Sequence, residues 1–156
     1  MKPHIGLTDV QRRNVAIILS KILADEYILL VKTKKYHWNV QGRQFNDLHK
    51  FFDEQHKQLT VITDDVAERI RALGNATPAT LVEFQKLTRL KEEQAIYPND
   101  KKMIENLLSD NETIIRTLRT ELETCNTIDA GTTDVLTGLM IKHEKMAWML
   151  RSFLEE

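Results

Sequence analysis

Residues 46–73 read NDLHKFFDEQHKQLTVITDDVAERIRAL and are followed by Gly74. The apolar residues of this stretch recur at steps of three, four and once seven, which is the spacing of one face of an α-helix. Gly74 is a residue type that commonly ends a helix. The sequence therefore predicts one long amphipathic helix over about residues 46–73. Its apolar positions are Leu48, Phe52, Leu59, Ile62, Val66, Ile70 and Leu73.

Three other long helices and one short helix are expected around this segment. The patterns TDVQ and TLVE are capping boxes, which predict a first helix over about residues 8–38 and a short helix over 81–87. Apolar residues at helical spacing predict two more helices, over about 99–125 and 133–154. Asn111 is expected to break the apolar stripe of the 99–125 helix. The inward positions predicted there are Ile104, Leu108, Ile115, Leu118, Leu122 and Cys125.

The order of these helices predicts the fold class. Two long helices, a long link that carries a short helix, and two more long helices are the layout of an all-α, ferritin-like four-helix bundle with one crossover. A length of 156 residues suits a single domain over residues 1–156. Only five Gly and three Pro interrupt the chain, which favours long helices over many short strands.

Composition excludes several classes of function. Hydrophobic residues make up 42% and charged residues 29%, the balance of a soluble globular protein. The longest apolar runs are too short to span a bilayer and no leader pattern opens the chain, so we expect a cytoplasmic protein with no membrane partner. The net charge of -1 provides no bulk attraction to polyanions. The single Cys125 is expected to be a small buried side chain.

A second face of the 46–73 helix carries metal-ligand side chains. With Leu48 at zero on a helical wheel, His49 falls at about 100°, Asp53 at about 140°, Asp64 at about 160° and Glu68 at about 200°. The apolar positions cluster around zero, so the ligand face points away from the bundle core. His49 and Asp53 lie on adjacent turns, as do Asp64 and Glu68. Each pair is half of a candidate metal site.

The two half-sites cannot meet within one chain. At about 1.5 Å per residue, His49 and Asp64 lie roughly 22 Å apart along the axis, far beyond ligand distances of about 2 Å. If two copies of the helix cross antiparallel about a two-fold axis near residues 57–60, His49 faces Glu68 and Asp53 faces Asp64 of the other copy. Histidine with carboxylate suits Fe(II), Zn(II) or Mn(II). An ordinary solvated helix face is the alternative.

The other histidines are less constrained by spacing. His37 ends the first helix next to the turn that leads back to His49, although an exposed histidine at a helix C-terminus is also favoured by the helix dipole. His56 lies near the ligand stripe but does not complete a Glu-x-x-His motif, so we expect it to be peripheral. His143 lacks that motif too, and we expect a core or interface histidine.

A specific pattern spans the predicted turn and second helix: KYHWNVQG at 35–42, then Phe45, Leu48, His49 and FDE at 52–54, then DDVAER at 64–69. This pattern resembles the Dps family of mini-ferritins, and the similarity extends over essentially the whole chain. The resemblance implies a hollow dodecamer that stores oxidised iron. It implies ferroxidase centres between subunits, with His37, His49 and Asp53 from one chain and Asp64 and Glu68 from its partner.

The resemblance also implies roles outside the ligand set. Fe(II) would be oxidised by hydrogen peroxide, with Trp38 as a nearby electron donor or simply as interface packing. Asp129 and Asp134 resemble the acidic lining of the family's iron-entry pores, although capping of a helix start is an equal alternative. The segment before Thr8 has only Lys2 and His4 as cations, so we expect weak or no DNA binding. A DNA-compacting stress protein and an inert helical assembly are the competing functions.

Overall fold

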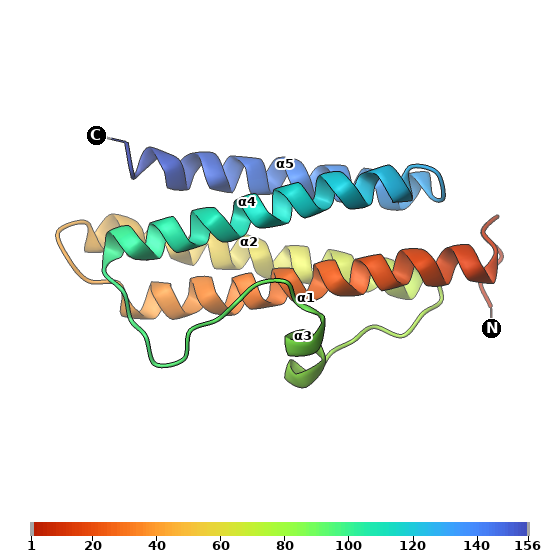
Figure 1. Cartoon of the computed structure of the whole chain (residues 1–156), viewed down its shortest axis with the longest axis horizontal. Coiled ribbons are helices and arrows are strands. Elements are labelled where there is room, and N and C mark those ends of the chain that lie inside the picture. Colours follow the sequence, from red (N-terminus) through yellow and green to blue (C-terminus); the bar gives the residue numbers. More distant parts are fainter. Residues whose placement is uncertain (1, 156) are drawn as a thin grey trace.

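The computed structural model describes residues 2–155, in which every regular element is an α-helix (Figure 1). Helices α1 and α2 pack side by side, α4 packs against α5, and α1 also contacts α4. The result is the predicted four-helix bundle, with the short helix α3 on the connection between α2 and α4. The helices are α1 (Asp9–Asn39), α2 (Phe45–Ala72), α3 (Leu81–Leu87), α4 (Asp100–Cys125) and α5 (Ala130–Ser152).

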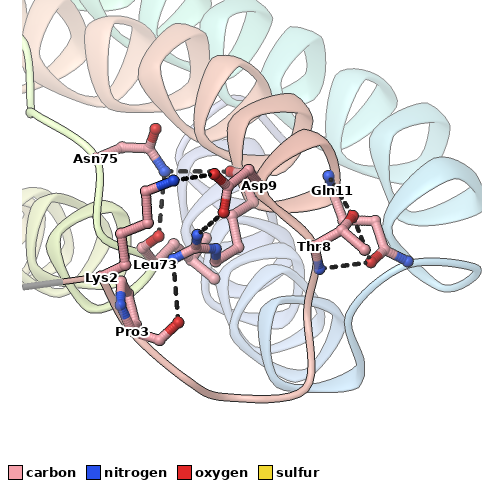
Figure 2. A network of polar contacts seen from close by, with 8 residues as sticks. Lys2, Pro3, Thr8, Asp9, Gln11, Leu73 and Asn75 are labelled. Carbon is pink, nitrogen blue, oxygen red and sulfur yellow. Dashed lines mark hydrogen bonds and ion pairs between the residues drawn. The ribbon is translucent and has the colours of Figure 1, made fainter.

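The start of α1 is fixed by a capping box and ion pairs, shown in Figure 2. The Thr8 hydroxyl accepts a hydrogen bond from the backbone N–H of Gln11 at 3.2 Å, and the Gln11 side-chain oxygen accepts one from the backbone N–H of Thr8 at 2.9 Å. Asp9 pairs with Arg12 and, at 2.7 Å, with the Nζ atom of Lys2. The segment before α1 is therefore held against the helix, and the charge of Lys2 is already paired.

The start of α5 differs from the prediction. We expected this helix to begin at Thr133, but it begins at Ala130 because Asp129 is its N-cap. The Asp129 carboxylate accepts a hydrogen bond from the backbone N–H of Thr132 at 3.2 Å, and it pairs with Arg69 of α2 at 2.5 Å. A cap that is also an ion pair to another helix fixes both the first turn of α5 and its position beside α2.

The buried face of α4 is also rotated from the prediction. Ile104, Leu118 and Cys125 are buried as expected, but Leu108, Ile115 and Leu122 are only partly buried. Met103, Leu107 and Ile114 form the rest of the core face. Asn111 lies on this face with 1% exposure, where its polar side chain interrupts the apolar stripe as expected.

Asn111 is buried because it belongs to a polar network inside the bundle. The Nδ1 atom of His143 in α5 lies 2.8 Å from the Asn111 side-chain oxygen, and its Nε2 atom lies 2.8 Å from Oε1 of Glu26 in α1. Glu26 and His143 are fully buried. The network links three helices, and it gives His143 the core position that we expected.

A buried aspartate and an aromatic stack are among the contacts that attach the crossover to α1. The carboxylate of the buried Asp25 accepts hydrogen bonds from the Thr88 hydroxyl and from the backbone and guanidinium N–H groups of Arg89, at 2.6 to 2.9 Å. The Tyr27 and Phe84 rings stack with centroids 4.4 Å apart. These contacts hold α3 against the outer side of α1 (Figure 1).

Among the described helices, none has an apolar stretch of the length and character needed to cross a membrane.

Candidate metal centre

His37 and His49 meet where α1 ends and α2 begins. The turn between these helices reverses the chain, and the two imidazole rings stack with centroids 4.0 Å apart and planes 22° apart. The Nδ1 atom of His37 lies 2.8 Å from the backbone oxygen of His49, and the Nδ1 atom of His49 lies 2.9 Å from the backbone oxygen of His37. A carbonyl oxygen only accepts hydrogen bonds, so each Nδ1 must carry the proton. In the neutral rings both Nε2 atoms are then free to bind a metal, as in known metal-ligating histidines.

Asp53 presents one carboxylate oxygen to the histidines and the other to a lysine. Its Oδ1 lies 3.0 Å from Nε2 of His56 and 3.9 Å from Nε2 of His37, while its Oδ2 lies 2.5 Å from Nζ of Lys57. The hydrogen bond from Lys57 lowers the pKa of Asp53, partial burial opposes that shift, and the hydrogen bond from His56 adds to it. The side chain is therefore a carboxylate at neutral pH.

Three side chains of one chain come close enough to share a cation. Ligand atoms of His37, Asp53 and His56 all lie within 4.8 Å of one another, and His49 is not part of this group. We expected His56 to be peripheral, but the structure places its Nε2 atom 3.0 Å from Oδ1 of Asp53. The signal was present in the wheel, where His56 falls at about 80°, close to His49. Searching for a Glu-x-x-His motif hid it, because the acidic residue three positions earlier is Asp53.

The second predicted half-site lies at the other end of α2. Asp64 and Glu68 are exposed side chains on adjacent turns. Because α2 runs without interruption from Phe45 to Ala72, His49 and Asp64 remain roughly 22 Å apart along the helix. The structure thus brings His37, His49 and Asp53 into one neighbourhood, and within one chain it does not bring Asp64 or Glu68 to them.

Large apolar side chains are exposed beside the histidines and along α2. Trp38 is 68% exposed, and the Nζ atom of Lys34 lies 5.5 Å from its ring centroid. Phe45 and Val61 are also exposed, and the Phe45 ring stacks on His49 with centroids 5.1 Å apart. Exposed large side chains such as Trp38 and Phe45 beside the histidines are typical of a surface that contacts another protein.

The two candidate pore residues have different surroundings. Burial raises the pKa of Asp129, but hydrogen bonds from Thr132 and Arg69 outweigh it and leave the pKa below its ordinary value. Its carboxylate is thus occupied by capping α5 and pairing with Arg69. Asp134 is exposed and lines a surface hollow between α2 and α5 together with Glu68.

Comparison with known proteins agrees with this architecture. The ferritin-like domain family matches residues 18–156, so the chain belongs to the ferritin-like proteins. A low temperature-induced protein of Nostoc, itself uncharacterised, is 47% identical over 97% of this chain and 86% of its own length. The DNA protection during starvation protein 2 of Bacillus anthracis is 34% identical over 92% of this chain and 99% of its own. Within the ferritin-like proteins, the chain is a member of the Dps family.

A solved structure supports the same assignment. The Dps protein of Vibrio cholerae, described as a member of a superfamily of ferritin-like diiron-carboxylate proteins, superimposes with a TM-score of 0.93 at 28% identity. The superposition covers 99% of this chain and 97% of that one. The predicted ferritin-like fold and the predicted family are therefore confirmed.

Proposed function

We propose that this protein is a ferroxidase that oxidises Fe(II) with hydrogen peroxide and stores the ferric product inside a dodecameric cage. Each centre would take His37, His49 and Asp53 from one subunit, and Asp64 and Glu68 from its two-fold partner. The observation that carries the proposal is the reciprocal hydrogen bonding of His37 and His49, which leaves both Nε2 atoms free of protons in the neutral rings.

The position of the carboxylates supports completion of the site by a second subunit. Asp64 and Glu68 are exposed near the opposite end of α2, where an antiparallel α2 would bring them to the histidine end of its neighbour. Trp38, Phe45 and Val61 offer apolar surface for that contact. Assembly would then be a condition of the activity, because neither half-site alone holds the full ligand set.

The ligand chemistry fits iron oxidation. Hard carboxylate oxygens favour Fe(III) over Fe(II), which makes loss of an electron easier. Two Fe(II) ions would each give one electron to hydrogen peroxide, whose O–O bond breaks to yield two water molecules with uptake of two protons. The reaction consumes both ingredients of hydroxyl-radical chemistry, so the cell would be protected against oxidative stress. Trp38 lies next to His37 in sequence and could supply an electron to the site.

Entry of iron and binding of DNA are separate questions. We propose Asp129 and Asp134 as pore residues; the carboxylate of Asp134 is exposed, whereas that of Asp129 is paired with Arg69. We expect weak or no DNA binding by residues 2–8, since Lys2 pairs with Asp9. Tight binding in a gel shift at about 150 mM salt would contradict this, because tail contacts to phosphates are salt-sensitive. We place the protein in the cytoplasm.

Peroxide-driven Fe(II) oxidation, followed by absorbance of the ferric product, tests the proposal. His49→Ala and Asp64→Ala should each oxidise iron far more slowly than the wild type. Subunits of the two variants are then unfolded together and refolded as a mixture. Mixed dimers contain one centre with both substitutions and one with neither, so about a quarter of the wild-type centres should return for random pairing. If both variants keep wild-type rates, the site assignment is wrong. If the mixture recovers nothing, the ligands do not come from different chains.

A further inference from the structure

His56 is placed as a metal ligand would be. It lies on α2 one turn after Asp53, with its Nε2 atom 3.0 Å from Oδ1 of Asp53 and its ring 5.4 Å from the ring of His37 in an edge-on arrangement. His56 is half-buried, as are His37 and Asp53. Two imidazoles from different helices thus converge on a single carboxylate oxygen.

The distances match those between neighbouring ligands of one cation. Ligands at about 2.1 Å from a metal are about 3.0 Å apart when they are at right angles, and about 4.2 Å apart when they are opposite. The His56 to Asp53 distance of 3.0 Å and the His37 to Asp53 distance of 3.9 Å fall within this range. The longer distance is beyond hydrogen-bonding range, and a cation between the two groups would join the Nε2 of His37 to Asp53.

We propose that His37, Asp53 and His56 form a divalent-metal site within a single subunit, which holds Fe(II) before or without any ligand from the partner. Two histidines and one carboxylate with open positions are the ligand set that suits Fe(II) in many non-haem iron proteins. The proposal rests on the proposed iron oxidation for the identity of its natural cation. It adds His56 to the ligand set and removes the need for a second subunit in the first binding step.

Neighbouring groups orient the His37 ring and compete with a cation for Asp53. The hydrogen bond from His37 Nδ1 to the backbone oxygen of His49 fixes the His37 ring with Nε2 toward Asp53. The proton that His56 donates to Asp53 would be replaced by the cation, which joins the same two atoms. Lys57 holds only the other oxygen of Asp53, at 2.5 Å, and its Nζ is largely exposed. A lysine at this position repels a cation, so it weakens the site without blocking it.

Binding of Co(II) to the full-length, metal-free protein tests the proposal. Co(II) bound to histidine and carboxylate absorbs visible light, and without added peroxide it stays Co(II) during the titration. Affinities are measured by titration for the wild type, His56→Gln, Lys57→Gln and the double variant Asp64→Asn/Glu68→Gln. Loss of His56 should weaken Co(II) at least as much as loss of a group that only orients a ligand, about 10- to 100-fold. Lys57→Gln removes the competing charge from the same helix face, and it should bind Co(II) more tightly than the wild type.

The double variant separates this site from the shared one. It should retain the high-affinity Co(II) site, because Asp64 and Glu68 are not among its ligands, while its iron oxidation collapses. If His56→Gln binds Co(II) like the wild type, His56 is not a ligand and the inference is wrong. If His56→Gln has a weaker helical circular dichroism signal than the wild type, His56→Asn takes its place, and its Co(II) affinity is judged in the same way. If the double variant loses Co(II) as fully as His56→Gln, the cation needs both subunits and the intrachain site is wrong. Normal oxidation by the double variant would overturn the proposed function and leave the Co(II) result standing.

Discussion

Replacing His143 with leucine should destabilise the bundle strongly, because this ring satisfies two buried groups at once. The side-chain nitrogen of Asn111 donates to the backbone oxygen of Leu107 at 2.8 Å, so the Asn111 oxygen must face His143 and accept from Nδ1. The remaining proton lies between Nε2 and Oε1 of Glu26, 2.8 Å apart. The second oxygen of Glu26 has no hydrogen-bond partner. After the substitution Glu26 would have none at either oxygen.

The expected decrease in the free energy of unfolding follows from the hydrogen-bond partners that are removed. Leaving a buried hydrogen-bonding group without a partner typically costs about 1–3 kcal/mol, and both Glu26 and Asn111 lose a partner here. A typical domain is stable by only about 5–15 kcal/mol, so His143→Leu should lose a large share of the total. The triple variant Glu26→Leu, Asn111→Leu and His143→Leu removes every member of the network. It should recover most of the loss, since apolar replacements of whole buried networks are often neutral or better.

Urea unfolding followed by far-UV circular dichroism measures these differences. All variants are compared at one protein concentration, because assembly makes apparent stability depend on concentration. His4→Leu is the matched control, since His4 is exposed and surface changes usually stay within about 0.5 kcal/mol. Wild-type stability in His143→Leu would refute the assignment of a proton-sharing pair. A triple variant less stable than His143→Leu would show that the network is worth more than the apolar packing that replaces it.

Three further outcomes are expected. Asp129→Asn should lower stability at neutral pH by up to about 1 kcal/mol through loss of the ion pair with Arg69, because asparagine keeps the N-cap; thermal unfolding measures the difference. Because the folded pKa of Asp129 is lowered, that contribution is present above the ordinary Asp pKa and is lost as pH falls through the folded pKa, so the wild type and variant should converge in acid. Burial raises the pKa of Cys125 to about 11, so a thiol reagent at neutral pH should react only after unfolding; fast labelling of the folded protein would contradict this. Gly74→Ala should cost about 1–2 kcal/mol or more in urea unfolding, since φ is +80° there and the added methyl group would meet Pro3.

The helices were predictable because their signals are local. Capping boxes and apolar spacing lie within one or two turns, so the first helix, α2 and α3 were predicted to within one residue at each end. The start of α5 was missed although its cap is local, because Asp129 accepts from Thr132 and we expected the helix only from Thr133. The ion pair between Asp129 and Arg69 joins residues 60 positions apart, which local patterns do not predict. On α4 the apolar spacing fits two neighbouring sets of positions, and the structure buries Met103, Leu107 and Ile114 more fully than Leu108 and Leu122. The residue that pairs with the buried Asn111, His143, is 32 residues away.

The candidate site was predictable only as far as single-helix geometry extends. The wheel placed His49 and Asp53 on one face of α2, and it showed that Asp64 lies too far along the axis to join them. How His37 would sit relative to α2 depends on the turn between the helices, which periodicity does not describe. The role of His56 depends on the same contact, because its neighbour in the cluster belongs to α1.

The position of His56 changes how the assembly and the chemistry depend on one another. If a shared centre alone bound iron, an unassembled subunit could not hold the ion, and binding and assembly would be linked in both directions. If His37, Asp53 and His56 of one subunit form the proposed site, Fe(II) would bind first, and the carboxylates of the partner would then add the hard oxygen ligands that favour Fe(III). Affinity for Fe(II) would come mainly from the imidazoles, and the driving force for oxidation mainly from the second subunit. A substitution at His56 would test the affinity for Fe(II), and one at Asp64 would test the driving force for its oxidation. Both residues lie on α2.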